Sequence, residues 1–551
     1  MPDSPARRLH AIRADFGAAA GVEKAALIER LTHQPPTRRA AVVRLHDDLL
    51  FLRAFPDSPA VLRAAARALA GFDRVVRALG AARHAADDSG MTGTVSHDAY
   101  AFATVEWLDA SFPGEVDIDW AQVDDESAID GLLRPALQRA EEDAFDSGEL
   151  TTHDWLVLRK GGRRETDLAR LLRLAPRRGA ARDVFRLMYD AADVPLRWRL
   201  AGSRGAATHA VLPTPRPVFR QAMRRPPAAA ARHIATPTRV IERLSPARAR
   251  AVIHLARAAL ASRGREVFAV YAANPAEVYL ADLGEGASIA VIGVLPEHRM
   301  SLEANYGYLM LSNGVPVGYG GVTPLYRQAN TGLNIFPSFR GGEAAYLWVA
   351  ALRAFRSLFR VTRFVVNAKQ VGEGNREAIA SGAFWFYYKL GFRPADAATG
   401  ALAAREFRRL GRRGPRTAPA TLRALAHGDL HLDLGRVPPS DFFDERWLVD
   451  VSRGATVQLA GTGARALADR LGQLLGCPAR GRWPADERAA FARLAPVCLQ
   501  LPGLARWSDA RRRAMVALLR AKGRPQERDF VLAARRDPNF YPALIRLASR
   551  G

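Results

Sequence analysis

The chain has 551 residues, of which 48% are hydrophobic and 25% are charged. This length exceeds what one hydrophobic core usually accommodates, so we expect several domains. No apolar run approaches the roughly 18 to 20 residues that a membrane-spanning helix needs, and the N-terminus lacks the apolar core of a signal peptide. The only cysteines, Cys477 and Cys498, give no disulfide framework. We therefore expect a cytoplasmic protein with no membrane partner.

The formal net charge of +24 raises the question of a nucleic-acid partner. Of the 80 basic residues 75 are arginine, which together with the high alanine content is typical of a GC-rich genome. An electrostatic interaction with nucleic acid is therefore open but not favoured. The charge is also uneven, because residues 115–149 hold twelve acids against two bases and residues 197–250 hold twelve arginines against one acid. We expect these two regions to face each other or the solvent.

Residues 1–200 are predicted to form a mainly helical N-terminal region. Helical periodicity covers most of the first 90 residues and returns after a short alternating run, Val116 to Trp120, which is typical of a strand. Six prolines then follow between Pro213 and Pro237. Because proline is excluded from helix interiors and central strands, residues 201–245 are predicted to be a Pro/Arg-rich connector.

Residues 246–410 alternate between strand-like and helix-like patterns. A helix is predicted over 246–262, and Ser312-Asn313-Gly314 joins two of the strands, since Asn-Gly is the strongest short hairpin signal. The order of strands followed by helix, strand and helix predicts an α/β fold with a mixed sheet. The predicted strands cover residues 278–282, 289–294, 306–311, 315–322, 333–336 and 361–367.

A glycine turn, Arg340-Gly341-Gly342, lies between a predicted strand and a long amphipathic helix. In this helix large apolar residues, among them Trp348 and Phe355, repeat at helical spacing on one face. A turn that leads into a helix leaves several backbone N–H groups without an internal partner. These donors and the positive end of the helix dipole bind anions, most often phosphate. We therefore expect the functional site at this turn.

Two stretches stand out in this region, Pro337 to Ala345 and, further along the chain, Asn375 followed by Tyr387 to Phe392. With them, residues 306–394 resemble the core of the GNAT superfamily of acyl-CoA-dependent acyltransferases. In that family a strand leads into the pattern Pro-x-x-Arg-Gly-x-Gly-x-Gly/Ala. The stretch from Pro337 to Ala345 is similar, with Glu343 where the middle glycine is expected. A second family signature is an asparagine that begins a helix ending in Tyr-x-x-Leu-Gly-Phe. Asn375 matches the asparagine, and Tyr387 to Phe392 matches the ending. About six extra residues lie between the two parts.

The resemblance implies a mixed-sheet GNAT-like acyltransferase domain, residues 246–410, flanked by mainly helical regions. It implies acyl-CoA as the cofactor, with acetyl-CoA as the expected donor, and an amine on a small molecule or a protein as the acceptor. It implies no metal. The residues that it places at the cofactor are Ile335, Phe336, Arg340, Gly341, Gly342, Ala344, Ala345 and Asn375.

Two residues are candidates for catalysis. In the family, the tyrosine at the position of Tyr387 protonates the departing CoA thiolate, and a phenol with a pKa near 10 suits that task. Because its helix is crowded with aromatic residues, Tyr387 is alternatively a core residue. Glu343 is a structural cap in an altered cofactor site, a sign that cofactor binding is lost, or the general base. Glu373, Glu377 and water are the other candidate bases.

After the resemblance ends, residues 395–410 are expected to complete the sheet edge. Residues 421–551 are predicted to form a mainly helical C-terminal domain. The stretch His427 to His431 is similar to the catalytic loop of aminoglycoside-type phosphotransferases, but no Gly-rich loop or partner lysine accompanies it, so we interpret it as a strand edge. Two alternatives to the acyltransferase stay open: a non-catalytic scaffold with the same fold, and an Arg-rich binder of nucleic acid or acidic partners.

Overall fold

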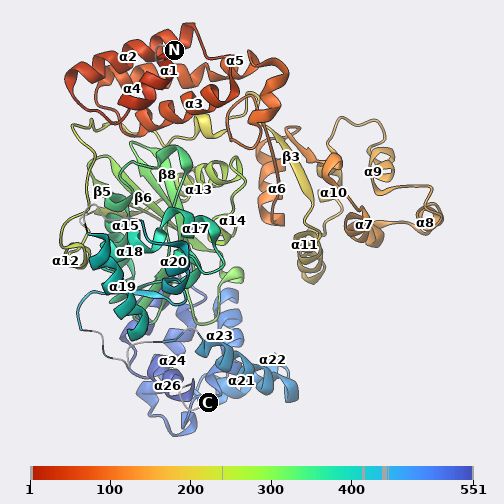
Figure 1. Cartoon of the computed structure of the whole chain (residues 1–551). Helices are drawn as coiled ribbons and strands as arrows, with labels where there is room; N and C mark the ends of the chain where they lie inside the picture. Colours follow the sequence, from red (N-terminus) through yellow and green to blue (C-terminus); the bar gives the residue numbers. More distant parts are fainter. Residues whose placement is uncertain are drawn as a thin grey trace.

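A computed structural model describes residues 4–238, 240–411, 416–436, 438, 443–444 and 446–548. They form a mixed α/β protein built around one large sheet (Figure 1). A helical bundle from the N-terminus covers one end of the sheet, and a helical C-terminal domain lies at the other end. A small lobe projects sideways from the junction between the bundle and the sheet.

The N-terminal bundle consists of five helices, and the local sequence sets the starts of two of them, α1 and α4. The hydroxyls of Ser4 and Ser58 each accept a hydrogen bond from the backbone N–H three residues on, and a proline follows each serine at the first helical position. The buried faces of these helices belong to the same hydrophobic core as the central sheet. The helices are α1 (Pro5–Ile12), α2 (Ala18–His33), α3 (Arg39–Ala54), α4 (Pro59–Ala70) and α5 (Phe72–Arg77).

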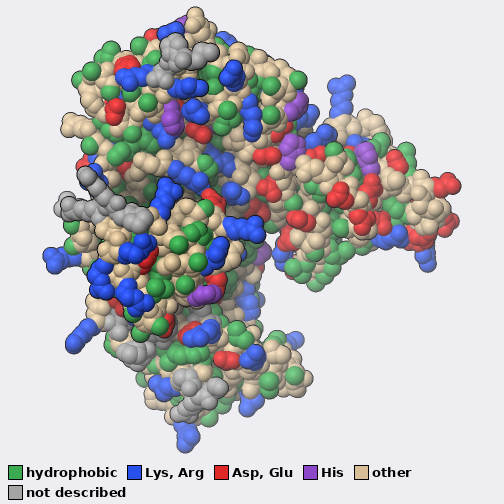
Figure 2. Space-filling model, viewed as in Figure 1, with side chains coloured by type: hydrophobic (Ala, Val, Ile, Leu, Met, Phe, Trp, Pro, Cys, Tyr) green, Lys and Arg blue, Asp and Glu red, His purple; other side chains and the backbone are tan. Residues whose placement is uncertain are grey.

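The lobe has a core of its own and a three-stranded antiparallel sheet in the order β1-β3-β2. The strand predicted from Val116 is confirmed as β2. Acidic side chains gather on this lobe (Figure 2), and Arg197 lies 4.0 Å from Asp117, whereas Arg220 pairs with Glu343 in the central domain. The acidic and basic regions therefore meet only in part. The elements are β1 (Val95–Ala99), α6 (Phe102–Ser111), β2 (Val116–Ile118), α7 (Ser127–Leu133), α8 (Arg139–Asp146), α9 (Thr152–Lys160), α10 (Asp167–Leu172), α11 (Ala180–Ala192) and β3 (Pro195–Arg199).

The proline-rich connector packs against both the bundle and the sheet, and its described residues contain one short α-helix, α12 (Ala230–Ala235). It is attached by backbone hydrogen bonds, from Leu212 N–H to the Gly314 carbonyl (2.8 Å) and from Arg220 N–H to the Pro56 carbonyl (2.7 Å). The connector is therefore part of the folded body, which the sequence pattern did not indicate.

The central sheet has the strand order β12-β13-β11-β9-β8-β7-β6-β5-β4, and β10 pairs with β8. Its neighbours are antiparallel except β9 and β11, which pair in parallel. The predicted hairpin at Asn313 and Gly314 is confirmed, and both residues have positive φ, as a tight hairpin turn requires. The strands are β4 (Val240–Arg243), β5 (Ala273–Gly284), β6 (Ala287–Val294), β7 (Tyr306–Ser312), β8 (Val315–Leu325), β9 (Gln328–Thr331), β10 (Asn334–Ile335), β11 (Arg363–Val366), β12 (Arg393–Pro394) and β13 (Leu430–Asp433).

Two segments of the central domain differ from the predicted pattern. Residues 397–410 form a helix, capped by the Asp396 carboxylate, so the expectation that 395–410 completes the sheet edge is wrong. The stretch beginning at His427 leads into β13, which lies between β11 and β12 within the sheet. The helices are α13 (Pro246–Ala261), α14 (Phe268–Tyr271), α15 (Ala344–Phe359), α16 (Ala368–Val371), α17 (Arg376–Ser381), α18 (Ala383–Lys389), α19 (Ala397–Leu410) and α20 (Pro419–Leu425).

The C-terminal domain has a separate core that also includes Leu325 at the end of β8 and the loop residues Leu302 and Tyr326 of the central domain. None of the helices in the described part of the chain has the length and apolar character that crossing a bilayer requires. The helices of this domain are α21 (Trp447–Gly461), α22 (Ala464–Leu474), α23 (Ala485–Cys498), α24 (Asp509–Ala521), α25 (Arg528–Arg536) and α26 (Phe540–Ala548).

Candidate functional site

The glycine turn lies where the sequence predicts it, directly before α15. Gly341 has φ +84° and no neighbouring atom where a side chain would begin, so the turn needs glycine for its backbone conformation. Helix α15 has no side-chain cap, and the N–H groups of Glu343, Ala344 and Ala345 have no hydrogen-bond partner among the described residues. These donors and the helix dipole make the turn suitable for an anion.

Glu343 points away from this turn and into the protein. Its carboxylate accepts two hydrogen bonds from the Arg220 guanidinium, at 2.8 and 3.0 Å, and one from the Arg224 backbone N–H at 3.2 Å. The side chains of Glu343 and Arg220 are both fully buried. The carboxylate therefore fastens the connector to the start of α15, and this placement fits neither a helix cap nor a base that reaches an amine.

The N-terminal bundle forms one wall of the turn. The Phe55 ring lies so close that a Cβ added to Gly342 would be 3.1 Å from one of its carbons. The Ser338 hydroxyl donates a hydrogen bond of 2.6 Å to the Asp47 carboxylate, and burial raises the pKa of that carboxyl. Sequence reasoning missed this wall, because residues 47 and 55 carry only the helical packing pattern of α3.

The second family signature lies beside the turn. The exposed Arg340 guanidinium is 2.5 Å from the Glu377 carboxylate on α17, so the two motifs meet across the surface. Asn375 caps α17: its side-chain oxygen accepts from the Ala378 N–H at 3.0 Å, and its amide donates to the Lys369 carbonyl at 3.2 Å. Both polar atoms of Asn375 are therefore used within the local structure.

The extra residues in the second signature divide its helix into two. Gly382, with φ +67°, ends α17 and precedes α18, which carries Tyr387. The aromatic residues of α18 pack inward, with Phe384, Trp385, Tyr387 and Tyr388 all buried. The insertion therefore breaks the helix in two, and Tyr387 on the second helix is still buried in the core.

The parallel pairing of β9 with β11 ends next to Tyr387. Residues 328–330 of β9 pair with residues 363–365 of β11, whereas β10, which continues the line of β9, pairs only with β8. The predicted strand 333–336 is thus the short β10, and the break before it falls at Gly332 and Leu333. Backbone donors and acceptors beyond the end of such a pairing have no partner in the neighbouring strand, and we call this place the opening between β9 and β11.

The hydroxyl of Tyr387 occupies this opening. It accepts a hydrogen bond of 3.1 Å from the Leu333 N–H, and burial raises the pKa of Tyr387 to about 12. The phenol is therefore protonated throughout the neutral range. The Gln370 side chain also fills the opening, because a Cβ added to Gly332 would lie 2.5 Å from its amide carbon. Sequence reasoning found Tyr387 but gave no signal for Gln370.

Two expected cofactor contacts differ in exposure. Phe336 is 2% exposed, stacks near Tyr319 and lies under Arg263, whose guanidinium carbon is 4.3 Å from the ring centre. Ile335 is only partly buried. Phe336 is therefore a core residue, and of these two residues only Ile335 has surface that a ligand can contact.

Within the described ranges no group of three or more His, Cys, Asp or Glu side chains is placed to hold a metal ion. The site itself offers backbone N–H donors, a protonated phenol and nearby charged side chains. Comparisons with protein-family models, with curated proteins and with solved structures found no match to this chain.

Proposed function

We propose that this protein is an N-acyltransferase of the GNAT type, which transfers an acyl group, with acetyl as the first candidate, from acyl-CoA to an amine. The proposal depends above all on one observation: the buried Tyr387 hydroxyl lies at the opening between β9 and β11 and is bonded to the Leu333 N–H. A proton donor, the Tyr387 phenol, and a backbone hydrogen-bond donor, the Leu333 N–H, lie at the same point. Together they suit the cleavage of a thioester.

The glycine turn is the proposed site of the pyrophosphate of acyl-CoA. The unpaired N–H groups of Glu343, Ala344 and Ala345 point out of the start of α15 and favour negative charge. Gly341 allows the backbone to approach the phosphates closely, and the exposed Arg340 next to it is paired with Glu377. Glu343 does not oppose this role, since its carboxylate is neutralised by Arg220.

The proposed reaction uses the opening next to Tyr387. The thioester oxygen takes the place of the phenol as the acceptor for the Leu333 N–H, which stabilises the negative charge that develops on it. The amine nitrogen attacks the carbonyl carbon, a C–N bond forms and the C–S bond breaks. Tyr387 gives its proton to the departing thiolate, and water removes the surplus proton from the nitrogen. This step requires Gln370 to move from the opening, and its flexible side chain allows that.

A second candidate function is a non-catalytic scaffold that keeps the same fold. The observation that favours it is the packing of the site, because Gln370 and Tyr387 fill the opening and the buried Arg220–Glu343 pair makes the turn a joint between connector and sheet. In such a protein, Tyr387 is a core residue that satisfies one backbone N–H.

Calorimetric titration with acetyl-CoA distinguishes the two. We expect saturable binding by the wild-type protein and much weaker binding by Gly341→Asp, which places a carboxylate beside the phosphates. Gly341→Asn is the matched control, because asparagine has the same shape, tolerates positive φ and carries no charge. If the wild-type protein releases no heat, or if the Asp and Asn variants bind alike, the turn is not a phosphate site and the scaffold takes its place.

A further inference from the structure

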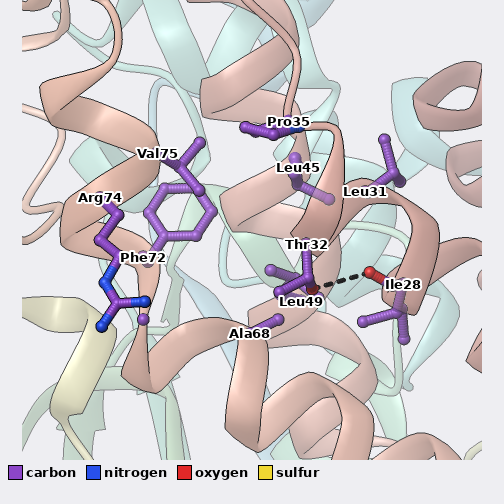
Figure 3. Close-up of a pocket in the computed structure, with 11 residues that line it drawn as sticks. Ile28, Leu31, Thr32, Pro35, Leu45, Leu49, Ala68, Phe72, Arg74 and Val75 are labelled. Atoms are coloured by element: carbon purple, nitrogen blue, oxygen red, sulfur yellow. Dashed lines mark hydrogen bonds between the residues drawn. The ribbon is translucent and has the colours of Figure 1, made fainter.

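A cavity in the N-terminal bundle lies apart from the candidate acyltransferase site. It is partly open to the surface, is lined by residues of α2, α3, α4 and α5 and of the loops between them, and has a volume of about 140 Å³ (Figure 3). An apolar cavity of about 150 Å³ holds one benzene ring, so this space is large enough for a small ring or a short branched chain. The residues that line it are Ile28, Leu31, Thr32, Pro35, Leu45, Leu49, Ala68, Gly71, Phe72, Arg74 and Val75.

One side of the cavity is apolar and well buried. Leu45, Leu49 and Phe72 are at most 3% exposed, and Figure 3 shows them facing the same space. The end of α4 contributes only Ala68 and Gly71 on its side, so the space opposite the leucines is not filled by the protein. Tightly packed cores rarely leave such a gap, which indicates room for a ligand.

Two polar side chains belong to the lining. The Thr32 hydroxyl donates its proton to the Ile28 carbonyl at 2.8 Å and is therefore satisfied within α2. Arg74 stands at the edge of the group in Figure 3 and is, among the described residues, the one charged side chain that lines the cavity. Across the described part of the chain, its guanidinium has no recorded hydrogen bond or ion pair, whereas the neighbouring Asp73 is paired with Arg77.

We infer that the cavity is a binding site for a small apolar carboxylate, with its ring or chain among the leucines and its carboxylate on Arg74. Apolar pockets with one fixed charge orient a ligand in this way, and an unpaired arginine fork matches a carboxylate. An amine of the same shape meets a like charge, and a neutral molecule forgoes the charge-assisted hydrogen bonds.

The site is separate from the glycine turn, although α3 contacts both. Leu45 and Leu49 line the cavity, whereas Asp47 bonds to Ser338 and Phe55 packs at Gly342 on another face of the same region. The inference does not depend on the proposed transferase, and binding at the two sites can be measured independently.

Calorimetry with benzoate as the probe tests the inference on the full-length protein. We expect saturable binding of benzoate, weaker binding of benzyl alcohol and none of benzylamine. Ala68→Leu fills the cavity and should abolish benzoate binding, with the circular dichroism spectrum reporting the fold. Arg74→Gln should weaken benzoate about 10- to 100-fold, as the loss of a charged hydrogen bond does, and leave benzyl alcohol unchanged.

The matched control is Arg63→Gln, an exposed arginine on α4 that does not line the cavity. It should bind benzoate as the wild type does. Arg74 is exposed, so its variant remains informative even if Ala68→Leu does not fold. The inference is overturned if the wild type does not bind benzoate, if a folded Ala68→Leu binds it equally well, or if Arg74→Gln and Arg63→Gln behave alike.

Discussion

At the scale of single residues, the most informative contact is the buried pair of Arg220 and Glu343. A glutamate in the first turn of a helix is ordinarily exposed and acts on the dipole. Here it lies inside the protein and meets an arginine 123 positions earlier in the chain, in a connector that the sequence presents only as proline-rich. Two charges without solvent are stable only as a pair, so each residue fixes the position of the other.

Removing one member of this pair should be costly. We expect Glu343→Gln to lower the free energy of unfolding by about 3–5 kcal/mol, because Arg220 is left buried without its counter-charge. Glu343→Gly should do the same, although it restores the glycine of the family pattern. The control is Glu285→Gln, whose exposed carboxylate pairs with Arg224 and is expected to contribute less than about 1 kcal/mol. Urea unfolding provides the comparison, and equal midpoints for the Glu343 and Glu285 variants would contradict the structural role.

Tyr387 permits a cleaner test of the chemistry. If it donates the proton to the thiolate, Tyr387→Phe should lower kcat by about 10²- to 10⁴-fold and leave the affinity for acetyl-CoA nearly unchanged. Tyr388→Phe is the matched control, since this neighbouring tyrosine packs among aromatic rings and loses only a hydroxyl away from the opening. Steady-state kinetics with an amine acceptor measures kcat for both variants. Turnover that survives Tyr387→Phe would leave this residue as part of the core.

At the scale of elements, local patterns predicted much of the secondary structure. The Asn313-Gly314 hairpin and the helix with Trp348 on its buried face follow from turn chemistry and from periodicity. The parallel pairing of β9 with β11 does not, because it joins strands separated by a helix and depends on packing between distant segments. The interior position of β13, contributed from beyond α19, escaped prediction for the same reason.

For the candidate site, too, the sequence predicted the local features but not the long-range contacts. The turn at Gly341 and the position of Tyr387 follow from motifs with a local physical basis. The partners that decide what the site can do, Arg220 and Gln370, come from other segments and carry no motif. Side chains that act through tertiary contacts have no periodic or turn signal, so only the structure reveals them.

The division of the second signature helix at Gly382 can be tested by comparing two glycines. Gly382 has φ +67°, so Gly382→Ala should destabilise the protein by about 1–2 kcal/mol. Gly400 lies within α19 with open space around it, so Gly400→Ala should stabilise by about 0.5–1 kcal/mol. Chemical denaturation measures both. Changes of the same sign would show that the break at Gly382 is not a backbone requirement.

At the scale of the whole molecule, the parts differ in how they are joined. The N-terminal bundle shares one apolar core with the sheet, whereas the C-terminal domain also meets it through buried charges. Glu277 of β5 accepts hydrogen bonds from the Tyr306 hydroxyl and from the N–H groups of Glu527 and Arg528, at 2.8–2.9 Å. Arg299 lies 3.5 Å from the same carboxylate. The junction therefore holds both apolar contacts and a network of paired charges.

This network should make the junction sensitive to pH. Burial, and then the charge of Glu527, raise the pKa of Glu277 to about 7 from the ordinary 4.5. A carboxyl with a raised pKa in the folded state stabilises that state fully below about pH 4.5, and the contribution is lost as the pH rises through about 7. The change amounts to about 3 kcal/mol, since each unit of pKa is worth about 1.4 kcal/mol.

We therefore expect Glu277→Gln to flatten the pH dependence of unfolding between pH 4.5 and 7, because glutamine does not titrate. The variant is also less stable at low pH, since the amide cannot accept both backbone N–H groups and the tyrosine hydroxyl as the carboxyl group does. Glu242→Gln is the control, because that carboxylate is exposed and its loss should leave the slope unchanged. Urea titrations at several pH values measure the slope, and a Glu277 variant that retains the wild-type slope would place the titrating group elsewhere in the junction.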